Sequence, residues 1–234
     1  MEEVSVLKAD TKNTKIIVDP GSCHMGKKEY AKELIDLAVD NGCWAIKFQL
    51  FKDMQPNIEL PREWWPELVE HAKGRIEIFA SVFDREAIEL LKTHGAKYVK
   101  FSYQQQFKLT EKEYQHRLNM CDFAQVIRSC MILTVHYRLQ DIRLYCSPMY
   151  PAPDNIAFDY IFKKYPYSGF SDHTLGYQST LRAIEAGAEY IEKHINLDHK
   201  DINVPDAEFA LKPKQLRRMM NAIRSNRERT LTTS

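Results

Sequence analysis

The sequence lacks the features that assign a protein to several specialised classes. No apolar run approaches the roughly 20 residues that a membrane-spanning helix needs, and residues 1–4 have neither the basic nor the apolar part of a signal peptide. The five cysteines are scattered and form no C-x-x-C pair, so neither a structural zinc site nor a disulfide framework is indicated. We therefore expect a cytoplasmic protein that makes no membrane contact.

An excess of one charge sign is also missing. The 33 Lys and Arg residues balance 32 Asp and Glu residues, which leaves a net charge of +1. No global field would recruit nucleic acid, and we expect no such partner. The hydrophobic content of 44% and the aromatic content of 11% are typical of a folded globular protein. Because no low-complexity linker or internal repeat divides the 234 residues, the chain is predicted to form one domain over residues 1–234.

Short β-rich runs alternate with helical segments along the chain. The predicted strands span residues 16–18, 45–49, 76–80, 98–101, 131–135, 143–146, 168–171 and 190–194. Apolar residues at helical spacing mark 27–41, 65–72, 85–93 and 177–186. Eight β-runs with interposed helices predict an α/β fold, a parallel sheet closed into a (β/α)8 TIM barrel, with an open doubly wound sheet as the alternative. Residues 4–15 are predicted to form an N-terminal hairpin at the bottom of the barrel.

One connection is unusually short. Between residues 131 and 146 the chain has room for two strands and a turn, but hardly for a crossover helix. Parallel neighbours normally need a dozen or more connecting residues. Either a helix is missing between the fifth and sixth strands, or the fifth strand is assigned wrongly.

Polar residues end or follow every predicted strand, where a barrel of this type carries its active site. They are Asp19, His24, Lys47, Gln49, Ser81, Lys100, Thr134, His136, Ser147, Tyr150, Ser171, Asp172, His173, Glu192, Lys193 and His194.

Two of these residues, His173 and His194, close consecutive strands, so their side chains can approach each other and share an ion. Imidazole suits Mn, Fe, Co, Ni, Cu or Zn, and carboxylate or water ligands favour a harder ion such as Mn. A packing or surface role is the alternative for either histidine.

Two lysines, Lys47 and Lys100, lie in otherwise apolar strand runs. Because burying an unpaired ammonium group is costly, each needs an anionic partner. One interpretation is a structural ion pair with Asp19 or Glu192. The other is a phosphate or carboxylate ligand, with the hydroxyls of serine and threonine residues at the same strand ends completing its site.

Several motifs together resemble the catalytic barrel of the sialic acid synthase family. The strongest are GFSDHTLG at residues 169–176 and IEKH at 191–194. Weaker matches are IKFQ at 46–49, HMG at 24–26 in the first loop, YPAP at 150–153 and PD at 205–206. The similarity extends from about residue 16 to about residue 223. It covers the barrel alone, so we expect no C-terminal antifreeze-like domain in this chain.

The resemblance implies a transferase that condenses phosphoenolpyruvate with N-acetylmannosamine or a related aldehyde sugar, giving a 2-keto sugar acid and phosphate. By this resemblance His173 and His194 hold a divalent metal, typically Mn²⁺, and Asp19 takes the place of a family glutamate proposed to manage protons or water. Family members dimerise partly through the antifreeze-like domain, so the resemblance leaves open a monomer or a homodimer with another interface. The residues expected to bind the phosphate and carboxylate of phosphoenolpyruvate are Lys47, Ser81, Lys100, Thr134 and Ser171, and those expected near the sugar are Gln49, Tyr150 and Asp206.

Two alternatives stay open at this point. A barrel of the same descent could bind a metal or a phosphorylated ligand without this activity. A metal-dependent aldolase or isomerase could use the same histidine pair on a different substrate.

Overall fold

The computed structural model describes residues 14–131, 138, 140–199 and 201–232. Within them, eight parallel strands pair in chain order and close into a barrel, which confirms the predicted (β/α)8 fold. The strands are β1 (Lys15–Asp19), β2 (Ala45–Leu50), β3 (Glu77–Val82), β4 (Tyr98–Phe101), β5 (Gln125–Cys130), β6 (Ile142–Cys146), β7 (Gly169–Asp172) and β8 (Tyr190–His194).

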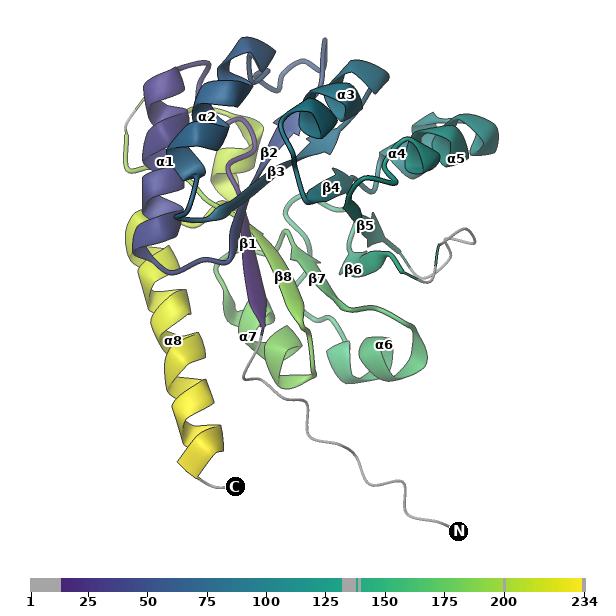
Figure 1. Ribbon diagram of the computed structural model, residues 1–234. Helices are drawn as coiled ribbons and strands as arrows, with labels where there is room; N and C mark the ends of the chain where they lie inside the picture. Colours follow the sequence, from purple (N-terminus) through teal and green to yellow (C-terminus); the bar gives the residue numbers. More distant parts are fainter. Residues whose placement is uncertain (1–13, 132–137, 139, 200, 233–234) are drawn as a thin grey trace.

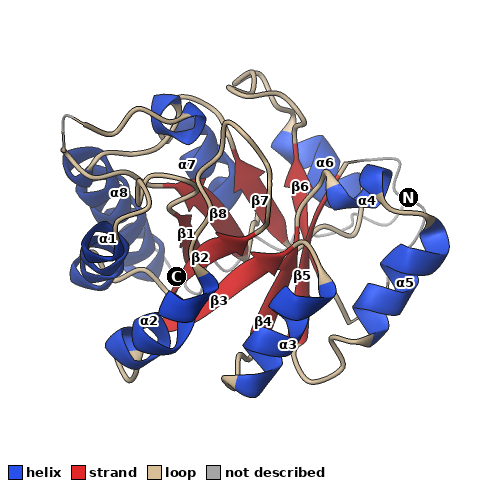
Figure 2. Cartoon of the chain, turned by 90° about the horizontal axis from the view of Figure 1, so that it is seen from above, coloured by secondary structure: helices blue, strands red, loops and turns tan. Residues whose placement is uncertain are grey.

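Helices surround the barrel (Figures 1 and 2). They are α1 (Lys28–Asp40), α2 (Trp65–Ala72), α3 (Arg85–Thr93), α4 (Gln105–Lys108), α5 (Glu111–Asn119), α6 (Phe158–Lys164), α7 (Gln178–Glu185) and α8 (Pro213–Thr232), with 3₁₀ turns at Arg62–Trp64 and Pro205–Glu208. The long helix α8 begins near the lower end of α1 and extends past it (Figure 1), and Arg224 of α8 donates to the carbonyl of Asn41 just beyond α1 at 3.2 Å. Among the described residues, no helix combines the length and apolar character needed to cross a membrane.

The interior of the barrel changes from apolar to polar along the strands. Near its N-terminal end a small core is formed by Ile17, Ala45, Phe79, Ile127 and Leu144. Two residues further along each of these strands the inward position is polar or a thiol, because side chains alternate between the two faces with a period of two. Those positions are Asp19, Lys47, Ser81, Ser129 and Cys146. The fold thus places an apolar layer beneath a polar one.

The pairing of the last two strands depends on a glycine. Gly169 is in register with Tyr190, and a Cβ atom at Gly169 would lie 1.9 Å from the carbonyl oxygen of Tyr190. Only a residue without a side chain permits this approach of the two backbones. The first glycine of the GFSDHTLG motif is therefore required by the barrel wall.

Two expectations need correction or fall outside the structure. The fifth strand of the barrel is Gln125–Cys130, so the assignment of the fifth strand to residues 131–135 was wrong. Of that predicted segment, residues 132–135 lie outside the described residues. The connection from β5 to β6 spans residues 131–141, of which 132–137 and 139 lie outside the described residues, so the absence of a crossover helix stays a prediction. Of the hairpin predicted over residues 4–15, Lys15 belongs to β1, and residues 4–13 lie outside the described residues.

Candidate active site

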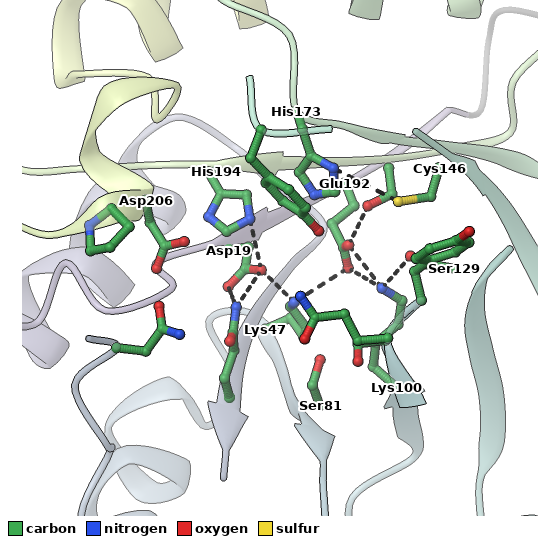
Figure 3. A pocket seen from close by; sticks show the side chains of 18 of the residues that line it. Asp19, Lys47, Ser81, Lys100, Ser129, Cys146, His173, Glu192, His194 and Asp206 are labelled. Carbon is green, nitrogen blue, oxygen red and sulfur yellow. Dashed lines mark hydrogen bonds and ion pairs between the residues drawn. The ribbon is translucent and has the colours of Figure 1, made fainter. Parts of the chain in front are cut away.

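A cavity of roughly 300 Å³ opens at the C-terminal ends of the strands (Figure 3), a volume typical of small-molecule sites. Ten predicted site residues line it: Asp19, Lys47, Gln49, Ser81, Lys100, Tyr150, Ser171, His173, His194 and Asp206. The remaining one, Thr134, lies outside the described residues.

Asp19 at the end of β1 connects the two sides of the cavity. Its carboxylate forms a buried ion pair with Lys47 of β2 and accepts a hydrogen bond from Gln49 Nε2 at 3.1 Å. Its Oδ2 atom also lies 3.3 Å from His194 Nε2. Burial opposes ionisation of Asp19, but the charge of Lys47 and the nearby His194 ring outweigh burial and hold the pKa of this carboxyl below its ordinary value. Asp19 is therefore a carboxylate held between a cation and an imidazole.

The second lysine is held in the same way by a second carboxylate. Lys100 Nζ donates to both oxygens of Glu192 of β8, at 2.8 and 3.0 Å, and to Ser129 Oγ at 2.8 Å. Ser171 Oγ donates to Glu192 at 2.7 Å, and Lys47 Nζ lies 3.7 Å from Oε2 of Glu192. Burial alone would raise the pKa of Glu192, but the charges of Lys100 and Lys47 outweigh burial. They hold the pKa below its ordinary value, so the carboxyl stays ionised.

Both carboxylates that the sequence suggested as ion-pair partners form such pairs: Asp19 pairs with Lys47, and Glu192 pairs with Lys100. All four side chains are at most 4% exposed, and all four line the cavity (Figure 3). The ion pairs therefore do not rule out a binding role, because a ligand in the cavity would meet these same charges.

The two histidines line the same cavity, His173 directly after β7 and His194 at the end of β8. The ring centroids of His173 and His194 are 5.5 Å apart. His173 Nδ1 lies 3.7 Å from the sulfur of Cys146. Burial, together with the neighbouring His194, lowers the pKa of His173 to about 3, so the His173 ring is neutral at physiological pH. His194 Nδ1 is buried and has no hydrogen-bond partner among the described residues.

The two histidines and Asp19 supply donor atoms that suit a transition-metal ion, but they do not complete its coordination. Neutral imidazoles are metal ligands, and the donor set of two nitrogens with a nearby carboxylate suits Mn, Fe, Co or Zn. The free Nδ1 of His194 is a buried polar atom that a ligand would satisfy. Nowhere in the described part of the chain, however, do three His, Cys, Asp or Glu side chains together form an ion site. Water or substrate oxygens would have to complete the coordination.

A second polar network lies on the outer side of the strands that carry the histidines. Asp172 accepts hydrogen bonds from the backbone and hydroxyl of Thr174, both at 2.8 Å, and from the hydroxyl of Thr180 of α7 at 2.6 Å. Lys193 lies 3.3 Å from Asp172 and donates to the carbonyl of Thr174. Asp172 and Lys193 are fully buried and do not line the cavity. This network ties β8 and α7 to the loop that begins at His173.

Asp206 reaches the cavity from the 3₁₀ turn after β8. Its Oδ2 atom accepts a hydrogen bond from the backbone of Ser22 at 2.8 Å. A Cβ atom at Gly21 would lie 2.2 Å from the same oxygen, so the glycine makes room for the carboxylate. Asp206 is thus fixed against the loop that follows β1 (Figure 3).

Sequence reasoning missed several lining residues. Glu192 was identified only as an ion-pair partner, although it lies two residues before His194 and so shares its face. Ser129 was missed because β5 was assigned wrongly. Cys146 and Phe209 gave no signal in the sequence, yet Cys146 contacts His173 and the ring of Phe209 lies 4.9 Å from that of His194.

Comparisons with known proteins agree with this geometry. The chain is 29% identical to N,N'-diacetyllegionaminic acid synthase of Campylobacter jejuni, over 91% of this chain and 76% of that protein. It is 27% identical to the spore coat polysaccharide biosynthesis protein SpsE of Bacillus subtilis, over 89% of this chain and 66% of that protein. The chain thus spans about two thirds to three quarters of these relatives.

The fold has a close counterpart among solved structures. The crystal structure of N-acetylneuraminic acid synthetase from Leptospira borgpetersenii superposes with a TM-score of 0.78 and 23% identity, over 93% of this chain and 85% of that one. A model of the NeuB family matches residues 52–232. The predicted resemblance to sialic acid synthases, and with it an enzyme of the synthase type, is confirmed. The chain belongs to the NeuB family.

Proposed function

We propose that this enzyme joins phosphoenolpyruvate to the aldehyde carbon of an amino sugar or related aldose, giving a 2-keto sugar acid and phosphate. The observation that carries the proposal is the presence in one cavity of two buried lysines and two buried histidines. The lysines suit an anionic substrate, and the histidines suit a metal that would activate an aldehyde. The family relationship supports the same reaction type.

The lysine side of the cavity is where phosphoenolpyruvate would bind. Burial opposes the charge on Lys47, but Asp19 and Glu192 raise its pKa above the ordinary value, so it stays an ammonium ion. Ser81 Oγ is buried and has no hydrogen-bond partner among the described residues, which leaves its hydroxyl available to an oxygen in the cavity. Lys47, Lys100 and the hydroxyl of Ser81 would hold the phosphate and carboxylate groups of phosphoenolpyruvate.

The histidine side is where the acceptor would be activated. His173 and His194 would hold a divalent ion, which we propose is Mn²⁺, since the nearby carboxylate of Asp19 favours a harder ion. When bound, such an ion would supply Lewis-acid polarisation of the aldehyde oxygen. Cys146 contacts the Nδ1 side of the His173 ring, which leaves Nε2 as the nitrogen for the ion.

The reaction forms a C–C bond, adds water at C2 and breaks the C2–O bond to phosphate. C3 of phosphoenolpyruvate forms a bond to the aldehyde carbon, which leaves an oxocarbenium at C2 and an alkoxide from the aldehyde. Water adds at C2 and the C2–O bond to phosphate breaks, so the water oxygen becomes the keto oxygen. One proton of the water reaches the alkoxide, and the other leaves with hydrogen phosphate. Asp19 is ionised and lies beside His194, so we assign it the role of accepting the proton that reaches the alkoxide and passing it on.

A phosphate-release assay tests the proposal. The chain would be incubated with phosphoenolpyruvate, Mn²⁺ and a panel of aldoses and amino sugars, with the keto acid identified by mass spectrometry. We expect acceptor-dependent release that His173→Ala abolishes and that Glu189→Gln, at the opposite end of the barrel, leaves unchanged. No release with any acceptor would refute the synthase reaction.

Metal binding is measured separately from catalysis. Calorimetry with Mn²⁺ alone should show binding to the unaltered chain and none to His173→Ala, whereas His116→Ala on the exposed face of α5 should bind normally. Unchanged Mn²⁺ affinity in His173→Ala would remove that residue from the site. The family resemblance leaves open a monomer or a homodimer, which sedimentation would distinguish.

A further inference from the structure

The loop that follows β8 is closed at its base. It spans residues 195–212, which are described except for residue 200. Ile195 and Leu211 form a parallel bridge that brings the two ends of the loop together. The second half of the loop carries Asp206 to the cavity. The orientation of this loop therefore decides where the Asp206 carboxylate lies.

The first half of the loop is attached to helix α1 by a stacked pair of rings. The imidazole of His199 lies on the ring of Tyr30, with the ring centroids 4.3 Å apart and an interplanar angle of 10°. His199 Nε2 also lies 2.7 Å from a carboxylate oxygen of Glu33. Residues three positions apart in a helix share one face, so Tyr30 and Glu33 contact the imidazole together.

Asp201 adds a second point of attachment beside the first. Lys27, immediately before α1, donates to the Asp201 carboxylate at 2.5 Å, and its ammonium group lies 4.4 Å from the centroid of the Tyr30 ring. The Tyr30 hydroxyl donates to Asp201 at 3.2 Å. Tyr30 thus contacts His199 through its ring and Asp201 through its hydroxyl. We call Lys27, Tyr30, Glu33, His199 and Asp201 together the α1 latch.

The strength of the α1 latch depends on its contacts acting together. Its carboxylates, its lysine and its imidazole have side chains that are between 39% and 48% exposed, and single exposed pairs of this kind contribute little. The stacked rings add to them, and contacts that share partners are coupled to one another. All of these contacts hold the same part of the loop to one helix.

A short, well-held segment joins the α1 latch to the cavity. Val204, which lies between Asp201 and Asp206 in the sequence, is buried. Its carbonyl accepts a hydrogen bond from the backbone of Ala207 at 3.0 Å, which closes the 3₁₀ turn around Asp206. The hydrogen bond from the backbone of Ser22 to Asp206 requires this turn to stay in place. A displacement of the loop at the latch is therefore passed on to the Asp206 carboxylate.

We infer that Tyr30 and His199 are positioning residues for the reaction, which hold Asp206 at the cavity although neither of them lines it. This inference rests on the proposed function, in which Asp206 lies near the acceptor. Without the α1 latch the loop would sample orientations in which the carboxylate is displaced. The effect should fall on acceptor binding, because the lysines proposed to bind phosphoenolpyruvate belong to β2 and β4 and do not contact this loop.

Steady-state kinetics tests the positioning role. His199→Ala should raise KM for the acceptor about threefold or more, with kcat and KM for phosphoenolpyruvate unchanged. His199→Phe, which keeps a flat ring on Tyr30, should recover part of this loss. The matched control is Lys32→Ala, which removes an ion pair between α1 and Glu67 of α2 and should leave the acceptor KM unchanged. Equal acceptor KM values in His199→Ala and Lys32→Ala would overturn the inference.

Hydrogen exchange tests the α1 latch without the reaction. Peptides that cover residues 201–211 include the amides of Ala207 and Ala210, which bond within the loop at 3.0 and 3.2 Å. These peptides should exchange about threefold or more faster in His199→Ala and in Asp201→Ala, whereas peptides from β3 should keep their rates. Unchanged exchange in the loop would overturn the inference and leave the proposed function standing. Faster exchange, in a chain that releases no phosphate with any acceptor, would instead refute the proposed function and the positioning role with it.

Discussion

Replacing Lys100 by methionine separates the structural and the binding roles of this buried lysine. Its ammonium group makes two hydrogen bonds to Glu192 and one to Ser129, and the ion pair is at most 3% exposed. Removing one partner of a buried pair typically costs about 3–5 kcal/mol. Glu192 would keep its hydrogen bond from Ser171, so we expect the lower end, about 3 kcal/mol. That is a large part of a typical unfolding free energy of about 5–15 kcal/mol.

A second substitution should restore stability without restoring binding. In Lys100→Met/Glu192→Gln no unpaired carboxylate is left, so we expect most of the lost unfolding free energy to return. If Lys100 holds the anionic substrate, however, the affinity for phosphoenolpyruvate should stay about tenfold or more below that of the unaltered chain in both variants. Urea unfolding followed by circular dichroism would measure the first effect, and calorimetry with phosphoenolpyruvate the second.

Two results would refute this reasoning. Recovery of phosphoenolpyruvate affinity in the double variant would show that Lys100 serves only to neutralise Glu192. A loss of under about 1 kcal/mol in the single variant would show that the pair is not buried as described. The control is Lys97→Met, since Lys97 is 75% exposed and pairs with Glu77 at 3.2 Å. We expect it to change stability by about 0.5 kcal/mol or less.

Three further predictions follow from single contacts. Gly169→Ala should lower the unfolding free energy by several kcal/mol, roughly 3 or more, because its Cβ would overlap the carbonyl of Tyr190; a normal urea midpoint would contradict this. Gly21→Ala should displace Asp206 and raise KM for the acceptor while leaving phosphoenolpyruvate affinity intact, and a normal acceptor KM would argue against a fixed carboxylate. Burial lowers the pKa of His24 to about 4, so its contribution to stability is complete above about pH 6.5 and declines as the pH falls toward 4. Urea unfolding would compare the unfolding free energies of His24→Asn and the unaltered chain. Because only the unaltered chain loses this contribution, the difference between the two should shrink by about 2 kcal/mol from about pH 7 to pH 5. A difference that does not change with pH would show that His24 is not buried in its neutral form.

Much of the barrel could be predicted because its strands are buried on both faces and read as short apolar runs. The predicted bounds 98–101 and 190–194 agree with β4 and β8. The polar layer was also predictable, since alternation along a strand brings Lys47 to the same face as Ala45 and His194 to the same face as Glu192.

The fifth strand could not be recognised from its composition. Gln125–Cys130 contains Arg128, which is 1% exposed. Its guanidinium pairs with Asp141 at 3.3 Å and lies 5.1 Å from the ring centroid of Tyr114. These partners come from other segments and are not visible in the strand itself, whereas the sequence of residues 131–135 is more apolar and therefore favoured the wrong assignment. The error concealed Ser129.

The choice of ion-pair partners also required the structure. The sequence placed two lysines and two carboxylates at strand ends, but it left open which lysine meets Asp19 and which meets Glu192. That choice depends on strand register and on which strands face each other across the barrel. The same is true of Cys146, whose contact with His173 spans 27 residues of sequence.

The alternation in β8 has a consequence for how this enzyme can change during evolution. Glu192 and His194 face the cavity, while Lys193 between them supports the outer network with Asp172. Substitutions can alter one side of the strand and spare the other. An insertion or deletion of one residue would exchange the two sides, bringing the lysine into the cavity and burying the histidine beneath α7. Lineages that retain this barrel are therefore expected to vary in the length of their loops, but not in the length of this strand.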